Sequence, residues 1–585
     1  MEDSTCLKDL QRRMSVEAMQ RGPEGIKEAD TALTILYNLC IDTGEQIMSY
    51  ECTSNADTPL AEVQQAALKK DLHLSIFEYI HGRPWDFGEE IDEDLFENSI
   101  LTLNEILQHK SEVNHPEHLT PKFTSEILRL PCIDGILDIL FEAAALCITP
   151  YLKDAAFQEA LLNNRQLPLL WSLLEKAAFV AQIPNIETSS APAIEKDIFN
   201  TITQISLLPN FPDHLQSDYT FIRILSSACI LTENDARTAS KSICACILLG
   251  NFATTDEHAS EVVSKLDLVS LFDFISLKAY GRSKSSVAPS LVISSSDTNE
   301  PPHVPTDTVY LHAAGGMLRH ISRPRNIREK HFTDPAALQA SIALCQYSEP
   351  EVQIQGLRLF RNLLATNFIT LTHSIDNHYT SSLIKVFTES DKEMVKLEVF
   401  RTVVRILNAF SSTDAWKPVN GQSNTDAAAQ DHHRAKEDSL SRFLTTPSVA
   451  EPLVFAVTLP VSQSNPQTYI VQLEGWLGLV MLVSSGYIGR YLSEECFKRD
   501  EMFEALKTAF TFQSIDPQDK TTMLVPVGLD ESSLSATQSQ VENHAKSNAI
   551  AFAVQSVNDH ALNDELRKRL QGLLSEAGIE VKPQL

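Results

Sequence analysis

Apolar residues recur at positions i, i+3, i+4 and i+7 in segment after segment of this chain, with almost no strand-like alternation between them. Several segments are apolar most of the way round, which is typical of helices buried between neighbours. The pattern therefore predicts an all-α protein built from packed helices. The segments that carry it most clearly are 31–40, 135–147, 167–183, 261–277, 308–321, 352–365, 394–410 and 472–485.

The ends of four such helices align with one another. The position that Asn251 holds in "ILLGNFATT" is held by His320, Asn362 and Ile406 in the helices that follow. The last two steps are 42 and 44 residues, and the first is also 42 once the Ser/Pro-rich insertion 281–307 is removed. A constant period of this length predicts a repeat architecture, an armadillo/HEAT-type α-solenoid superhelix with several long disordered loops.

Asn251 follows three apolar residues at a helix end, where an Asn competes with the helix backbone for hydrogen bonds. In a three-helix repeat the last helix lines a concave groove, and an Asn there can grip the backbone of a bound partner. Asn251 is thus interpreted as a solvent-facing groove residue, and its recurrence at Asn362 favours this interpretation. The alternative, that Asn251 only caps its helix, stays open.

The repeats divide the chain unevenly. Long stretches rich in small polar and acidic residues lack helical periodicity, and we expect them to be mobile. The predicted organisation is degenerate helical repeats in 1–183, an armadillo array in 184–511 with loops at 281–307 and 412–440, a disordered loop in 512–545 and capping helices in 546–585. Within the first region, 84–98 holds seven carboxylates and is either a solvated linker or a docking strip for a basic segment.

Composition and charge narrow the function. The chain has 48 Lys and Arg against 77 Asp and Glu, a net charge of −29, which disfavours nucleic acid and attracts basic partners. Only 19 of 585 residues are glycine, in agreement with helix. The ten cysteines lie mostly inside apolar helices without a CxxC pair, as buried free thiols of a reducing compartment do. Without a secretory signal or an apolar run long enough for a bilayer, a cytoplasmic or nuclear location is expected.

Three neighbouring stretches resemble the armadillo array of the SmgGDS family of small-GTPase GDP-dissociation stimulators. They are "CILLGNFATTDEHASEVVSKLDLVSLFDFI", "VYLHAAGGMLRHISRPRNIREKHF" and "EPEVQIQGLRLFRNLLA", which together cover about 230–410. The chain would be a divergent, fungal-like member. The resemblance implies a protein that binds Rho- or Rap-like GTPases with polybasic tails, promotes GDP release and chaperones them. It places the groove Asn of the family on Asn251, a second family Asn on Thr255 and the next repeat's Asn on His320.

No catalytic signature is present, neither a phosphate-binding GxxxxGK[ST] loop nor GxSxG, HExxH or a kinase set. We therefore expect a monomeric binding protein with no cofactor and no metal, whose exchange activity would arise from binding alone. The basic residues around Arg319 either compensate a helix dipole or contact an acidic GTPase surface. The candidate partner-binding residues are Asn251, Thr255, Arg319, His320, Arg323 and Asn362.

Two other classes of function stay open at this point. One is a chaperone and exchange factor for heterotrimeric Gα subunits, and the other is an armadillo scaffold or adaptor of importin type. The four Trp residues follow no period, which disfavours the importin type.

Overall fold

A computed structural model describes most of the chain, and it is helical throughout. The described residues are 4–40, 67–68, 71–87, 89–107, 120–133, 136, 138–181, 190–230, 236–283, 306–364, 372, 374–375, 379–411, 426–460, 467–511, 538–558 and 562–581. No strand occurs in these ranges, so the predicted all-α class is confirmed for them. The chain forms two compact units, Met1–Thr254 and Thr255–Leu585.

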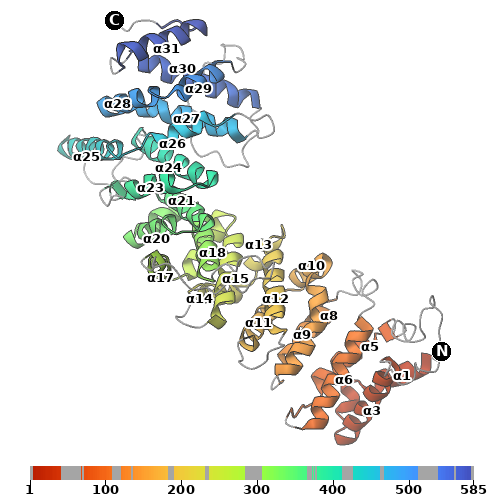
Figure 1. Cartoon of the computed structure of the whole chain (residues 1–585). Coiled ribbons are helices and arrows are strands. Elements are labelled where there is room, and N and C mark those ends of the chain that lie inside the picture. Colours follow the sequence, from red (N-terminus) through yellow and green to blue (C-terminus); the bar gives the residue numbers. More distant parts are fainter. Residues whose placement is uncertain are drawn as a thin grey trace, which may run out of the picture. The chain divides into compact units, whose positions relative to one another are not determined.

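The first unit is a stack of helices (Figure 1). Five of its helices, α3, α6, α9, α12 and α15, pack on one another in chain order, and the shorter α5, α10 and α14 pack against α6, α12 and α15. The bounds are α1 Ser4–Arg13, α2 Val16–Met19, α3 Pro23–Cys40, α5 Leu72–Gly82, α6 Glu90–Leu107, α8 Pro121–Arg129, the 3-10 helix η2 Leu130–Cys132, α9 Asp138–Leu152, α10 Ala155–Asn163, α11 Leu167–Val180, α12 Ala191–Ile205, α13 Phe211–Gln216, α14 Tyr219–Ala228 and α15 Ala236–Phe252.

The second unit repeats this arrangement. Here the row of helices that pack in chain order is α18, α21, α24, α27 and α30. The bounds are α16 Asp256–Lys265, α17 Leu268–Ser283, α18 Thr306–Ile321, α19 Arg325–His331, α20 Pro335–Cys345, α21 Pro350–Leu364, α23 Tyr379–Glu389, α24 Glu393–Ser411, α25 Asp426–Leu444, α26 Glu451–Thr458, α27 Gln467–Val483, α28 Gly486–Phe497, α29 Asp500–Phe510, α30 Gln538–Asn558 and α31 Asp564–Glu576.

Local sequence sets where many of these helices begin. Thr120, Asp154, Asp218 and Thr255 each stand before a helix, and each side chain accepts a hydrogen bond from the backbone N–H three residues on. Such caps satisfy donors that the first helical turn leaves unpaired. Close packing also shapes the core, because a Cβ atom on Gly356 of α21 would lie 2.6 Å from the backbone nitrogen of Cys345 in α20. Only glycine permits this approach of the two helices.

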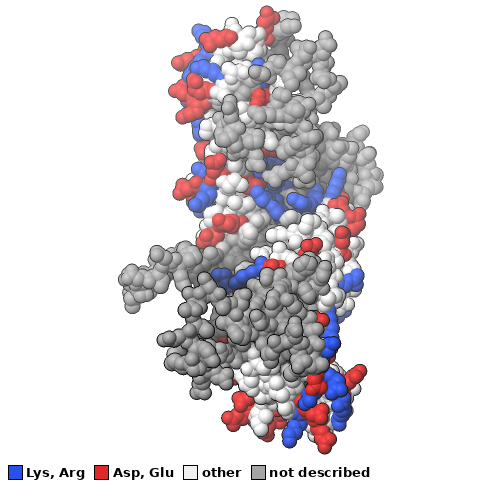
Figure 2. Space-filling view, turned by 90° about the vertical axis from the view of Figure 1, so that its right-hand side faces the viewer, with Lys and Arg blue, Asp and Glu red and all other residues white. Residues whose placement is uncertain are grey.

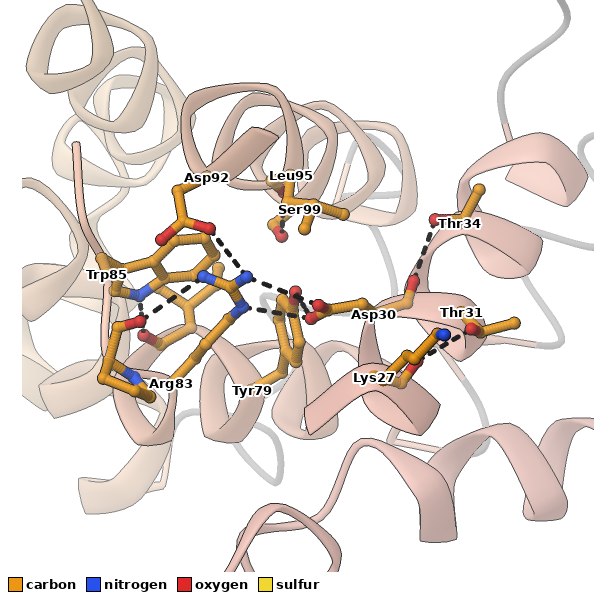
Figure 3. A network of polar contacts seen from close by, with 12 residues as sticks. Lys27, Asp30, Thr31, Thr34, Tyr79, Arg83, Trp85, Asp92, Leu95 and Ser99 are labelled. Atoms are coloured by element: carbon orange, nitrogen blue, oxygen red, sulfur yellow. Dashed lines mark hydrogen bonds and ion pairs between the residues drawn. The ribbon is translucent and has the colours of Figure 1, made fainter. Parts of the chain in front are cut away.

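A buried polar network joins three helices of the first unit (Figure 3). The guanidinium of Arg83, after α5, binds Asp30 of α3 through Nε at 3.0 Å and Asp92 of α6 through Nη2 at 2.8 Å. It also lies 4.5 Å from the centre of the Trp85 ring, and the Tyr79 hydroxyl donates to Asp30 at 2.6 Å. With two carboxylates and an aromatic face around it, this almost fully buried cation is well compensated.

The structure corrects parts of the predicted organisation. The loop predicted at 412–440 contains α25 from Asp426, because "DAAAQDHHRAKED" consists largely of good helix formers although it lacks an apolar stripe. Likewise α30 begins at Gln538, inside the loop predicted at 512–545. The compact units divide after Thr254, and the change from degenerate to regular repeats predicted at 183 stays a prediction. The loop 281–307 is almost entirely outside the described residues, apart from the last turn of α17 and the start of α18.

The acidic stretch 84–98 is not an unstructured linker. Phe87 and Phe96 pack against Trp85, and α6 starts at Glu90. Asp92 is occupied by Arg83, whereas Glu89, Glu90, Asp94 and Glu97 are exposed.

Across the described ranges, no helix has the length and apolar composition needed to cross a membrane. In the same residues no three His, Cys, Asp or Glu side chains are grouped in a way that could hold a metal ion. The eight described cysteines are free thiols, and all but Cys132 are buried, as predicted.

Candidate functional site

Six arginines come together on three successive helices of the second unit. Arg319 is in the last turn of α18 and Arg323 follows that helix, Arg358 and Arg361 are on α21, and Arg401 and Arg405 are on α24. We call these six residues the arginine cluster. In Figure 2 a band of Lys and Arg side chains lies at the height that α21 and α24 occupy in Figure 1. Such a concentration of positive charge is unexpected in a chain with a net charge of −29.

One buried carboxylate organises the middle of the arginine cluster. Glu398 of α24 is only 1% exposed, and it accepts from Arg358 Nε at 2.9 Å and from Arg361 Nη1 at 2.8 Å. Arg401 Nη1 lies 3.5 Å from the same carboxylate. Burial alone would raise the pKa of Glu398, but the three guanidiniums outweigh it and hold this pKa below the ordinary value. Glu398 is therefore ionised, and it fixes arginines from two neighbouring helices in one place.

A second carboxylate extends the network to α27. Glu474 Oε2 lies 3.5 Å from Arg401 Nε. Burial raises the pKa of Glu474 above its ordinary value, although Arg401 and Arg361 act in the opposite direction. The pKa values of the two carboxylates thus shift in opposite directions, because three guanidiniums lie within 3.5 Å of Glu398, whereas only Arg401 lies that close to Glu474 among the described residues.

The α18 end of the cluster contains no carboxylate. Arg319 Nη2 lies 2.6 Å from His320 Nε2. Because a guanidinium can only donate, His320 accepts through Nε2 and carries its ring proton on Nδ1. Burial, together with Arg319, Arg323 and Arg358, lowers the pKa of His320 to about 4, so the imidazole is neutral at physiological pH. Burial and the positive charges of Arg358 and Arg323 likewise lower the pKa of Arg319 to about 10.

Asn362 connects α21 to this end of α18. Its Nδ2 donates to the backbone oxygen of Arg319 and to the hydroxyl of Ser322, both at 3.1 Å. Four of the residues that the sequence singles out, Arg319, His320, Arg323 and Asn362, therefore lie together. The side chain of Asn362 itself is used for holding the repeats in place.

The two remaining candidates are not part of this group. Asn251 belongs to the first unit, where its Nδ2 donates to the hydroxyl of Ser206 at 2.8 Å. Asn251 is partly exposed, and its amide nitrogen is used in this contact between helices, so its groove-facing role stays a prediction. Thr255 is exposed and caps α16 by accepting from the backbone N–H of His258 at 3.2 Å. Whether either residue also binds a partner stays a prediction.

Sequence reasoning missed the centre of the cluster, namely Arg358, Arg361, Glu398, Arg401 and Arg405. The signal was present as polar residues that interrupt two otherwise apolar helices, "VQIQGLRLFRNLL" and "VKLEVFRTVVRIL". Spacings of three and four residues place such side chains on one face of each helix. Arginine binds carboxylates and phosphates through parallel N–H donors, so the cluster has the chemistry that anion recognition requires.

The comparisons with known proteins support the fold. No protein-family model and no curated protein sequence matches the chain. Among solved structures the chain is similar to SYS-1, with a TM-score of 0.50 and 11% identity over 99% of this chain and 86% of that one. It is similar also to SYS-1 in the SYS-1/POP-1 complex, with a TM-score of 0.50 and 12% identity over 98% and 87%. These neighbours have the armadillo fold, so the predicted armadillo architecture is confirmed. The resemblance to the SmgGDS family stays a hypothesis.

Proposed function

We propose that this chain is a non-catalytic armadillo protein that binds an acidic surface of a protein partner through the arginine cluster. The observation that carries this proposal is that five guanidiniums, those of Arg319, Arg323, Arg358, Arg361 and Arg401, gather around only two nearby carboxylates, Glu398 and Glu474, among the described residues. A surface that concentrates positive charge within an acidic chain selects negatively charged partners and speeds their association. One structural neighbour was solved as a complex of SYS-1 with POP-1, so the fold can hold a protein partner.

The finer proposal is that the partner is a small Ras-superfamily GTPase with a basic tail, of the Rho or Rap type. Its acidic switch surface would contact Arg319 and Arg323, while the net charge of −29 would attract the basic tail over a distance. The sequence resemblance to the SmgGDS family supports this choice. Under this proposal the protein acts in the cytoplasm or nucleus, as a monomer, with neither metal nor cofactor.

Nucleotide release needs no catalytic residue in this scheme. A protein that binds the nucleotide-free GTPase more tightly than the nucleotide-bound form must lower the nucleotide affinity by the same factor. The same preference for an open state would let the chain hold a GTPase as a chaperone.

The test uses the full chain and a purified Rho-type GTPase loaded with a fluorescent GDP analogue. We expect faster release of the analogue in excess unlabelled GDP, and a loss of this effect in the double variant Arg319→Gln/Arg323→Gln. A purified Gα subunit in the same assay separates the two classes of GTPase. Release that is unchanged for every GTPase, together with no measurable binding, would rule the GTPase proposal out.

A further inference from the structure

The six arginines fall into two groups when their partners are compared. Arg358, Arg361 and Arg401 share Glu398, and Arg401 also approaches Glu474. In contrast, Arg319 and Arg323 have no carboxylate partner among the described residues. Apart from burial, the largest influences on the pKa of Arg319 are the positive charges of Arg358 and Arg323, and each is larger than the opposing effect of Glu398. The α18 end of the cluster therefore holds about two units of positive charge that no carboxylate of the described residues pairs with directly.

This end is also built for donating hydrogen bonds. Arg319 Nε is buried and makes no hydrogen bond in the described structure. Arg358 binds Glu398 through Nε alone, which leaves the two Nη groups for another acceptor. His320 is neutral and adds a ring N–H. Because every cation of this group is an arginine, the side chains present planar sets of donors and not the single point charge of a lysine ammonium.

We propose that Arg319, Arg323 and Arg358 bind a phosphoryl group carried by a serine or threonine of the protein partner. The proposal rests on the protein-binding function proposed for the arginine cluster. A phosphorylated side chain has a charge of about −1.5 to −2 and three acceptor oxygens, so a single group matches both the charge and the donors at this end. A single carboxylate supplies about half of that charge, as Glu398 does in the middle of the cluster.

The dipole of α18 does not account for this arrangement by itself. A helix C-terminus favours cations in its last turn, which can explain Arg319. Arg358, however, comes from the neighbouring helix, and its charge adds to the repulsion that already lowers the pKa of Arg319. A bound dianion would remove this repulsion, and partner phosphorylation would thereby switch binding on.

The experiment measures binding of the full chain to three fluorescein-labelled pools of nine-residue peptides with degenerate flanks. The central residue is phosphoserine or phosphothreonine in the first pool, glutamate in the second and unmodified serine or threonine in the third. Fluorescence anisotropy reports the affinity. We expect the phosphorylated pool to bind at least about tenfold more tightly than the glutamate pool, and inorganic phosphate to compete with it.

Variants locate the binding to the proposed residues. Arg319→Gln and Arg323→Gln should each weaken binding of the phosphorylated pool about tenfold. Arg323→Lys should keep only part of the affinity, because an ammonium has the charge but not the planar set of N–H donors of a guanidinium. The matched control is Arg325→Gln. Arg325 lies two residues from Arg323, is exposed and pairs with Glu329 at 2.7 Å, so this variant removes the same charge from a neighbouring position. It should leave binding unchanged. Since Arg323 is exposed, its variants test the site even if Arg319→Gln does not fold.

Several results would overturn the inference. Equal affinity for the glutamate and phosphorylated pools would mean that the cluster binds acidic segments without preference. Full binding by both arginine variants would place the site elsewhere. Failure of the GTPase assay with retained phosphopeptide binding would remove only the GTPase proposal, whereas GTPase binding that ignores phosphorylation would remove only this inference.

Discussion

The side-chain amide of Asn251 donates to the hydroxyl of Ser206 across 2.8 Å, which joins the ends of α15 and α12. Ser206 is the C-cap residue of α12 and is buried, with 3% of its surface exposed. Asn362 of α21 makes the equivalent bond, at 3.1 Å, to the hydroxyl of Ser322, the residue that follows α18. In both units, therefore, two helices that stack on one another are joined at their ends by a hydrogen bond from an Asn of the later helix to a Ser at the end of the earlier helix.

We predict that Asn251→Ala lowers the free energy of unfolding by about 1 kcal/mol, because Ser206 loses its donor in a buried position. The change is read from urea denaturation followed by circular dichroism. Asn200→Ala is the control, since this Asn is exposed on α12, and it should stay within about 0.5 kcal/mol of the original protein. Unchanged stability together with weaker partner binding would instead support the groove role first inferred for Asn251.

Glu398→Gln should cost about 3 kcal/mol at neutral pH, because it leaves buried guanidiniums without their counter-charge. The pKa of Glu398 is lower in the folded protein than in the unfolded chain. Its contribution is therefore fully present above the unfolded value of about 4.3 and is lost as the pH falls through the folded value. Urea titrations from pH 7 to pH 3 should show the difference between the two proteins shrinking in acid. The exposed Glu389, paired with Lys385, provides the control Glu389→Gln, which should have little effect at any pH.

Glu474→Gln should change the free energy of unfolding in the opposite direction to Glu398→Gln. The pKa of Glu474 is raised in the folded protein, so its ionised form is disfavoured there. The stability that goes with the protonated form is present below about pH 4.3 and is lost as the pH rises through the folded pKa. A neutral Gln should thus make the protein more stable at pH 7, with the gain disappearing in acid. A loss of stability at pH 7 would show that the contact with Arg401 outweighs the burial of the charge.

Arg83→Ala should destabilise the first unit by about 3 to 5 kcal/mol, since Asp30 and Asp92 would then face each other without a cation. Limited proteolysis that reports on residues before Thr254 should detect the change while the second unit keeps its protection. Arg12→Ala is the matched control, because this arginine is 76% exposed and its one ion pair among the described residues is with Asp9. A uniform loss of protection across the chain would mean that the two units unfold together.

Replacing the exposed carboxylates Glu89, Glu90, Asp94 and Glu97 by their amides should slow association with a GTPase that has a basic tail. Long-range attraction acts mainly on the association rate and is screened by salt. Stopped-flow kinetics at low and high salt should therefore show a difference between the two proteins only at low salt. Asp92 is left unchanged because Arg83 holds it. Equal rates at low salt would exclude this strip from steering.

The sequence by itself determined the helical class and the repeat period. Apolar residues at helical spacing, few glycines and side chains such as Thr120 and Asp154 before the helices act over a few residues, so they can be read directly from the chain. The helix α25 was missed because most of its residues are polar. They favour helix formation, but they do not form the apolar stripe from which a helix is recognised. Arg319, His320 and Arg323 were found because they stand close together in the sequence.

Only the tertiary structure decided what these residues meet. Glu398 is 37 and 40 residues from Arg361 and Arg358, and their contact depends on how α24 is rotated against α21. A helix rotated by one residue would move the carboxylate about 100° around its axis. The same holds for Asn251, whose orientation toward Ser206 is set by the packing of α15 on α12. Local spacing fixes which face of a helix is polar, whereas the neighbour that this face meets is fixed by the packing of whole repeats.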